Sequence, residues 1–123
     1  MPSLNNRVFD NGLTVLDTEA NRLDITSQEA TTYSNATSTY SLGNSTSLSI
    51  AAPSDRGAGG REVVVAAISD GSVTATGTAT HYAIVDTVNS RLLATGSLTA
   101  SQPVTNGNTF TLGSFTIGIP DPA

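Results

Sequence analysis

Apolar and polar residues alternate with a period of two in short runs, and glycine, asparagine and aspartate residues separate these runs. Such runs are typical of half-buried β-strands joined by turns. Helical periodicity is nearly absent from the chain. The pattern therefore predicts an all-β protein built from about eight short strands.

The central part of the chain predicts a tight hairpin. Glu62–Ile68 is almost wholly apolar and predicts a buried strand. Asp70-Gly71 then supplies a dipeptide that favours a two-residue turn, and Ser72–Thr80 predicts the returning strand. Small apolar residues and threonines alternate along Ser72–Thr80, so we expect the small residues to face the core.

A second hairpin is predicted from His81–Val85, through Asp86–Ser90, to Arg91–Leu98. Apolar residues occupy both odd and even positions of His81–Val85. Such a stretch either contains a bulge or is covered on both faces. In a protein of this size, coverage on both faces would suggest packing against another subunit.

The end of the chain predicts a turn at Asn106-Gly107 followed by a final strand. Phe110 and Leu112 lie on even positions, whereas the apolar residues of Phe115–Ile119 lie on odd positions. The parity therefore changes around Gly113-Ser114, where glycine would permit a bulge.

The first half of the chain is less regular. Leu13–Leu16, Arg22–Ile25 and Ser47–Ile50 predict short strands, and one helical turn is expected near Tyr33–Thr37. The glycine-rich composition of Pro53–Arg61 predicts a flexible loop.

These elements predict one domain with an extended N-terminal arm. We expect residues 1–12 to form the arm and residues 13–123 to form a single β-sandwich, either jelly-roll or immunoglobulin-like. A chain of 12.5 kDa can bury roughly two-thirds of its unfolded surface, so a core without disulfides is feasible.

The composition leaves few side chains for catalysis. The sequence contains no cysteine, lysine or tryptophan and a single histidine, His81. Thiolate catalysis, iron–sulfur clusters and cysteine-ligated zinc are therefore excluded. The chain also lacks the Gly-x-Ser-x-Gly motif that would present a nucleophilic serine. We predict no enzymatic activity, no catalytic residue, no cofactor and no metal.

The charge pattern argues against two classes of partner. The net charge is −5, and five arginines do not form the basic face that nucleic-acid binding requires. No segment has the composition of a membrane span or a signal peptide. Half of the carboxylates lie in the first thirty positions without the spacing of an EF-hand, and we expect them to form a solvated acidic surface. These residues are Asp10, Asp17, Glu19, Asp24 and Glu29.

Several strand-and-turn runs resemble small virion proteins of tailed bacteriophages. The runs are Asp10–Leu13, Arg22–Ile25, Ser27–Glu29, Gly71–Ala83, Leu92–Leu98 and Gly107–Phe110. The resemblance implies a structural role on the particle, namely a capsid decoration or cement protein that binds the outer head surface and stabilises the shell. It implies no catalytic residues.

This role implies the major capsid protein and copies of the chain itself, in a trimer, as partners. The protein would be made in the host cytoplasm and located on the capsid surface. The arm and the Pro53–Arg61 loop would clamp neighbours by strand addition, and arginines would pair with shell carboxylates in bidentate geometry. The candidate contact residues are Arg7, Phe9, Arg56, Arg61, His81 and Tyr82.

Two other functions fit the same pattern. A tail, neck or head-fibre component of a virion would use the same fold and the same hydroxyl-rich surface, in which 34 of 123 residues are serine or threonine. A carbohydrate-binding adhesion module would also suit a β-sandwich, although aromatic residues are scarce.

Overall fold

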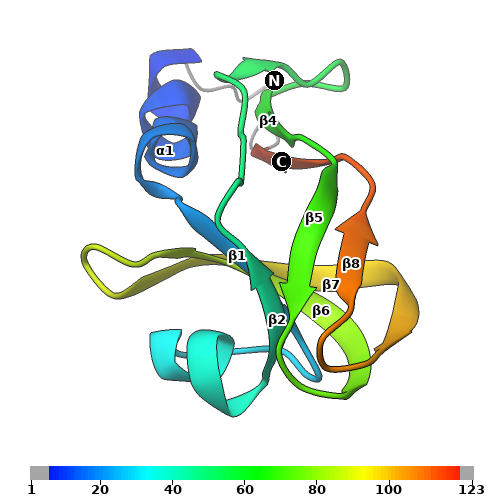
Figure 1. Cartoon of the computed structure of the whole chain (residues 1–123). Helices are drawn as coiled ribbons and strands as arrows, with labels where there is room; N and C mark the ends of the chain where they lie inside the picture. The colour runs from blue at the N-terminus through cyan, green and yellow to red at the C-terminus, as the bar shows by residue number, and fades with distance from the viewer. Residues whose placement is uncertain (1–5, 120–123) are drawn as a thin grey trace. The chain divides into compact units, whose positions relative to one another are not determined.

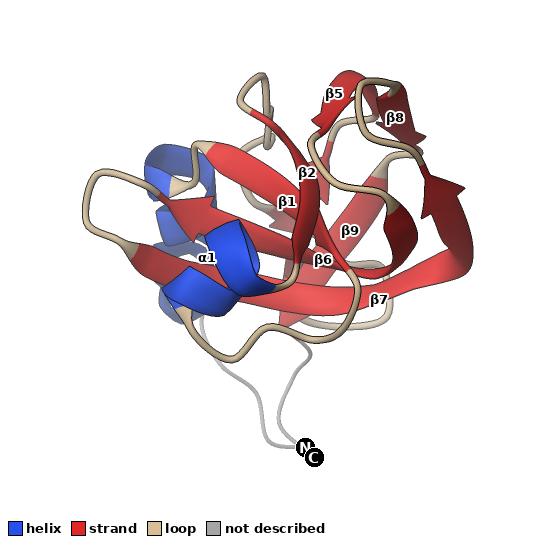
Figure 2. Cartoon of the chain, turned by 60° about the horizontal axis from the view of Figure 1, so that its bottom comes forward, coloured by secondary structure: helices blue, strands red, loops and turns tan. Residues whose placement is uncertain are grey.

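A computed structural model of the chain describes residues 6–119. Most of these residues form antiparallel strands, as the alternation predicts (Figure 2). The chain divides into two compact units. Among the described residues, the first comprises 6–19, 49–67 and 113–119, and the second comprises 20–48 and 68–112.

The first unit contains helix α1, Asn6–Glu19. A helix thus replaces both the extended conformation expected for residues 6–12 and the strand expected for Leu13–Leu16, whereas residues 1–5 of the predicted arm lie outside the described residues. Leu13 and Leu16 are three positions apart and therefore share a helix face, and both are buried. The helix packs against β4, which covers this face. That contact explains the outcome, because a short isolated helix is only marginally stable in water.

The first unit also contains a three-stranded antiparallel sheet in the order β3-β4-β9. Its strands are β3 (Ser54–Asp55), β4 (Arg61–Val65) and β9 (Phe115–Ile119). The predicted loop Pro53–Arg61 thus contains strand β3, the first residue of β4 and the turn of the β3–β4 hairpin. Three of its glycines have positive φ angles, of 82° at Gly57, 99° at Gly59 and 88° at Gly60, which L-residues rarely adopt.

The second unit is a six-stranded sheet in the order β7-β6-β1-β2-β5-β8 (Figure 1). The strands are β1 (Arg22–Thr26), β2 (Ser41–Ser45), β5 (Ile68–Val73), β6 (Gly77–Asp86), β7 (Arg91–Val104) and β8 (Thr109–Leu112). Although β7 and β8 lie at opposite ends of this order, Gln102 Nε2 of β7 donates a hydrogen bond of 3.2 Å to the Thr111 carbonyl of β8. The sheet is therefore curled.

Several sequence predictions are confirmed in the second unit. The strand predicted for Arg22–Ile25 is β1, and the hairpin through Asp86–Ser90 joins β6 to β7. The helical turn predicted near Tyr33–Thr37 leads into the short π-helix η1, Asn35–Thr39. The turn at Asn106-Gly107 is also present, with Gly107 at a φ of 93°.

Three other predictions are wrong. Asp70-Gly71 lies inside β5 and makes no turn. Ser72–Thr80 is not one strand, because β5 ends at Val73 and β6 begins at Gly77. The strand expected over Ser47–Ile50 lies earlier in the chain, as β2. Local turn propensity failed at Asp70-Gly71 because pairing with β8 holds this segment extended.

The parity change near the C-terminus has a tertiary cause. Strand β8 pairs with β5 in the six-stranded sheet, whereas β9 pairs with β4 in the three-stranded sheet. Gly113-Ser114 therefore links two sheets and is not a bulge within one strand. The same change of sheet divides the predicted strand Glu62–Ile68 between β4 and β5.

The two-sided apolar stretch of β6 is covered within this chain. Ala83 and Val85 belong to a buried cluster with Ala30 and Ala36, against which Tyr33, Tyr40 and Leu92 pack. Ile84, on the other face, lies opposite Leu23 of β1, and both side chains are fully buried. The predicted bulge is also present, as a register shift between Ala79 and His81. Another subunit is therefore not needed to explain this stretch.

Two aromatic rings lie on glycines across the six-stranded sheet. Gly71 is the register partner of Phe110, and Gly96 is the register partner of Tyr82. A Cβ atom added at Gly71 would lie 2.3 Å from the Phe110 ring, and one added at Gly96 would lie 2.6 Å from Tyr82 Oη. Each ring thus occupies space that only glycine leaves free, and this fixes the register of its strand pair.

Replacing Gly71 with alanine should destabilise the protein by roughly 1–3 kcal/mol, because the new methyl group must displace the Phe110 ring. Gly113→Ala is the matched control, since a Cβ there meets nothing within 4 Å. Chemical denaturation of the two variants measures the difference. Equal stabilities would contradict the proposed ring-on-glycine packing.

Val85 and Val88 offer a second matched pair on the β6–β7 hairpin, because Val85 is 0% exposed and Val88 is 81% exposed. Val85→Ala removes two buried methyl groups and should cost about 2 kcal/mol of unfolding free energy. Val88→Ala should change it by less than about 0.5 kcal/mol. Urea denaturation of both variants would show whether the burial assigned to β6 is correct.

Candidate functional site

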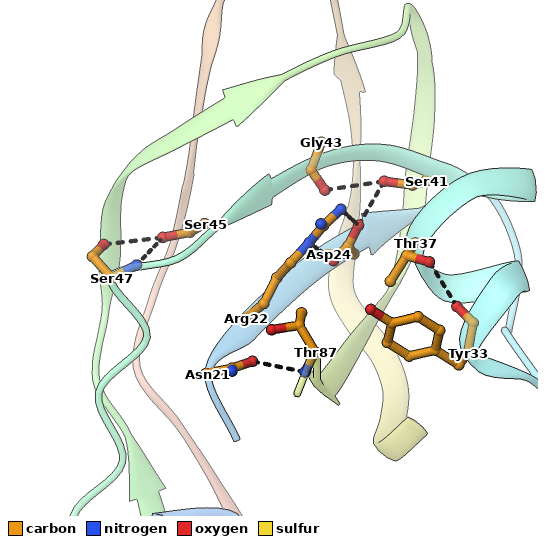
Figure 3. Close-up of polar contacts among 10 residues, drawn as sticks. All are labelled: Asn21, Arg22, Asp24, Tyr33, Thr37, Ser41, Gly43, Ser45, Ser47 and Thr87. Carbon is orange, nitrogen blue, oxygen red and sulfur yellow. Dashed lines mark hydrogen bonds and ion pairs between the residues drawn. The ribbon is translucent and has the colours of Figure 1, made fainter. Parts of the chain in front are cut away.

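A buried polar cluster surrounds Asp24 on β1 (Figure 3). Alternate residues of a strand share a face, so Arg22 lies beside Asp24. Arg22 donates from Nε to Asp24 Oδ1 at 2.7 Å and from Nη2 to Asp24 Oδ2 at 2.9 Å. The Ser41 hydroxyl, on β2, donates to Asp24 Oδ2 at 2.7 Å. The cluster therefore joins two neighbouring strands of the sheet.

Burial and hydrogen bonding act on Asp24 in opposite directions. Burial of the carboxyl raises the pKa of Asp24 above its ordinary value, while the hydrogen bonds from Arg22 and Ser41 and the charge of Arg22 offset part of that rise. The hydrogen bond to Asp24 also raises the pKa of Arg22. The Asp24 side chain is 0% exposed, and both of its oxygens accept hydrogen bonds from within the chain. The geometry is that of a structural ion pair.

The second buried carboxylate, Asp86, organises the turn between β6 and β7. It accepts hydrogen bonds from the side-chain amide of Asn89 at 2.8 Å and from the backbone N–H of Val88 at 2.9 Å. These bonds, with the Asn89 side chain contributing most, lower the pKa of Asp86. Ser90 completes the turn at a φ of 55°. Asp86 therefore stabilises a hairpin and is already engaged within the chain.

The predicted contact residues His81 and Tyr82 are neighbours on β6, and both are partly buried. His81 Nδ1 lies 2.8 Å from the Thr80 hydroxyl, which also donates to the Ser27 carbonyl at 3.0 Å. Burial raises the pKa of the Tyr82 hydroxyl. The Tyr82 ring covers Gly96, so the structure gives this residue a role within the sheet.

Arg56 and Arg61, at the two ends of the β3–β4 hairpin, differ sharply in their partners. Arg61 pairs with Asp55 at 2.7 Å and donates to the Pro53 carbonyl at 3.3 Å. Arg56 is exposed, and its Nη1 donates to the Gly59 carbonyl at 3.1 Å. Within residues 6–119 no carboxylate pairs with Arg56. Arg61 therefore stabilises the hairpin, whereas Arg56 is exposed and pairs with no carboxylate among the described residues.

Arg56 extends across the sheet to β9. Its Cδ would lie 3.0 Å, and its Nε 3.1 Å, from a Cβ atom placed on Gly118. Glycine at position 118 thus leaves the space in which the Arg56 side chain lies. The position of Arg56 over Gly118 was not predicted from the sequence, although an isolated glycine inside a strand such as Phe115–Ile119 often marks close approach by another group.

For the two remaining candidate contact residues, the structure describes only the backbone. Arg7 and Phe9 belong to α1, and their side chains lie outside what the structure describes. The expected acidic surface is corrected at Asp24, which is buried, whereas Glu29 is exposed. The structure therefore groups Arg56 with Arg61 in one hairpin and His81 with Tyr82 on one strand.

The described part of the chain holds no group of three histidine or acidic side chains suited to a metal ion. Each buried side-chain nitrogen or oxygen described has a hydrogen-bond partner. No helix within residues 6–119 combines the length and apolar character needed to cross a membrane. Comparison with protein families, curated proteins and solved structures found no match.

Removing the Arg22 side chain should leave Asp24 as a buried, uncompensated charge. We expect Arg22→Ala to lower the unfolding free energy by about 3–5 kcal/mol at neutral pH. This loss of stability should shrink as the pH falls toward 3.8, the ordinary pKa of Asp. Because burial raises the pKa of Asp24 in the folded state, the folded protein binds a proton there more tightly than the unfolded chain does, and protonation removes the buried charge.

The double variant Arg22→Ala/Asp24→Asn is the control, since it removes the titrating carboxyl together with its partner. Stability measured by urea denaturation across the acidic range should have a weaker pH dependence in the double variant than in Arg22→Ala. Parallel curves would contradict the assigned ion pair.

Proposed function

We propose that this protein is a non-enzymatic structural component of a tailed-phage virion, and specifically a capsid decoration protein that binds the outer head surface. The observation that carries this proposal is that each sheet has an edge strand with no charged residue over all or nearly all of its length. β7 has no charged residue from Leu92 to Val104 and lies along the margin of the six-stranded sheet (Figure 2). β9 ends the three-stranded sheet and carries no charged residue. Edge strands can bind a neighbouring chain through main-chain hydrogen bonds.

The buried carboxylates support a structural role. Asp24 and Asp86 are both engaged by hydrogen bonds within the chain, and each stabilises a connection between strands. The hydrogen bonds of both carboxylates therefore stabilise the fold. A protein that reinforces a shell works through shape and repeated contacts, and weak contacts sum when many copies bind one particle.

The proposal includes a β-sandwich, of jelly-roll or immunoglobulin-like type, for which the curled six-stranded sheet is the main support. It names the major capsid protein and further copies of this chain as partners on the virion surface after synthesis in the host cytoplasm. A trimer would match a three-fold position of an icosahedral shell. The trimer now depends on that symmetry argument, because the apolar stretch of β6 is covered within the chain.

A tail, neck or head-fibre component is the second candidate, since the same edge strands would serve there. A carbohydrate-binding adhesion module is the alternative from another class. Glycan binding by the isolated protein would support that alternative.

Quantitative mass spectrometry of purified virions from the source that encodes this chain tests the proposal. Hundreds of copies per particle, with antibody labelling on the head, are the expected result. A few copies labelled at the tail would support the tail or neck alternative. Absence of the protein from the particles would overturn the virion assignment.

A further inference from the structure

Strand β9 contains no bulge, proline or charged residue, the features within a strand that commonly protect a sheet edge. All five of its residues pair with β4 in one continuous antiparallel register. The other side of β9 pairs with no strand among residues 6–119, so its outward N–H and C=O groups form an edge. Natural edge strands are commonly blunted by bulges, prolines or charges. β7 has register shifts and Pro103, whereas β9 has none of these features.

The apolar face of this sheet is less covered at β9 than at its centre. On β4, Val63 and Val65 are 0% exposed. Their register partners on β9, Ile117 and Phe115, are only partly buried, as is Ile119. One more strand beside β9 would extend this face and bury these side chains further.

Arg56 adds a charge on the opposite face of the same strand. Thr116 and Gly118 are exposed there, and the Arg56 side chain lies across Gly118. A strand added beside β9 would place its outward-facing side chains close to this guanidinium. Arginine prefers carboxylates, and Arg56 has no such partner among the described residues.

We propose that the β9 edge, together with Arg56, binds an extended segment of a partner protein that carries a carboxylate. The segment would add a strand through main-chain hydrogen bonds, place alternate apolar side chains beside Ile117 and present an acidic side chain to Arg56. The identity of the partner as a shell protein rests on the proposed function. The binding of an acidic extended segment to the β9 edge does not depend on that function.

A second copy of β9 fits this edge less well. The residues Phe115–Ile119 contain no carboxylate, so a pair of β9 strands would bring no acidic side chain from these strands to either Arg56. Charge complementarity therefore favours a different chain with an acidic extended segment.

The test uses the full-length, isotopically labelled protein and a capped peptide, Val-Thr-Val-Asp-Val-Thr, in an NMR titration. The matched peptide has Asn in place of Asp. We expect both peptides to shift the amide signals of β9, and the Asp peptide to bind roughly two- to five-fold more tightly. Arg56→Gln should abolish this preference. The control Arg91→Gln, an exposed arginine of the other unit, should retain it.

Two further probes separate the main-chain contacts from the charge contact. N-methylation of one alternate set of peptide amides should abolish binding, and methylation of the other set should not, because only one set of N–H groups points at the edge. Gly118→Ala should reduce the preference for Asp, since its Cβ would crowd the Arg56 side chain and shift it from its position across β9. Binding of the Asn peptide should persist in this variant.

Three outcomes would overturn the inference. One is a lack of binding by either peptide. A second is a dimer that the peptide dissociates, which would assign the edge to another copy. A third is binding only after residues 1–5 are deleted, which would assign the edge to the chain itself. Failure of the peptide test would leave the virion measurement unaffected, and the converse also holds, so the two proposals can fail separately.

Discussion

The second unit depends on satisfying one buried charge at its centre. Strand β1 lies between β2 and β6, and four of its five residues are buried, including Asp24. An unpaired carboxylate at this position would be very costly. The chain satisfies it from its own strand with Arg22 and from the adjacent strand with Ser41. The same face is covered further along by η1, where Ala36 packs against Ala83 and Val85. The order of β2, β1 and β6, the packing of η1 on this face and the hydrogen bonds of Asp24 therefore stabilise the same part of the sheet.

Glycine provides much of the close packing in a chain with few aromatic residues. Phe110 lies on Gly71 and Tyr82 lies on Gly96, each across a pair of strands, and Arg56 lies across Gly118. In each case the missing Cβ leaves room for a large side chain from a neighbouring element. The first two contacts fix strand register inside a sheet. The third contact places the Arg56 guanidinium on the edge strand β9. The absence of a Cβ atom therefore supports strand packing in the second unit and the proposed binding edge in the first.

The arginines show how tertiary context separates residues that look equivalent in sequence. Arg22 and Arg61 are committed to carboxylates of this chain, at 2.7 Å from Asp24 and from Asp55 respectively. Arg56 is exposed, donates to the Gly59 carbonyl, and pairs with no carboxylate among residues 6–119. A site of this kind recognises an extended chain by its backbone and a single charge. Recognition of this kind would suit the proposed decoration protein, which binds many equivalent copies of one partner on a shell.

The sequence by itself determined the strand-rich class, β1, the β6–β7 hairpin and the turn at Asn106-Gly107, because these follow from alternation and local turn chemistry. It also identified Arg56 and Arg61 as candidates without distinguishing their roles. Only the tertiary structure decided that residues 6–19 are helical, that Asp70-Gly71 stays extended opposite Phe110, and that β8 and β9 belong to different sheets. These outcomes depend on partners distant in sequence, whose packing overrides local propensity. The different surroundings of Arg56 and Arg61 were decided in the same way, since they depend on where Gly118 and Asp55 lie in space.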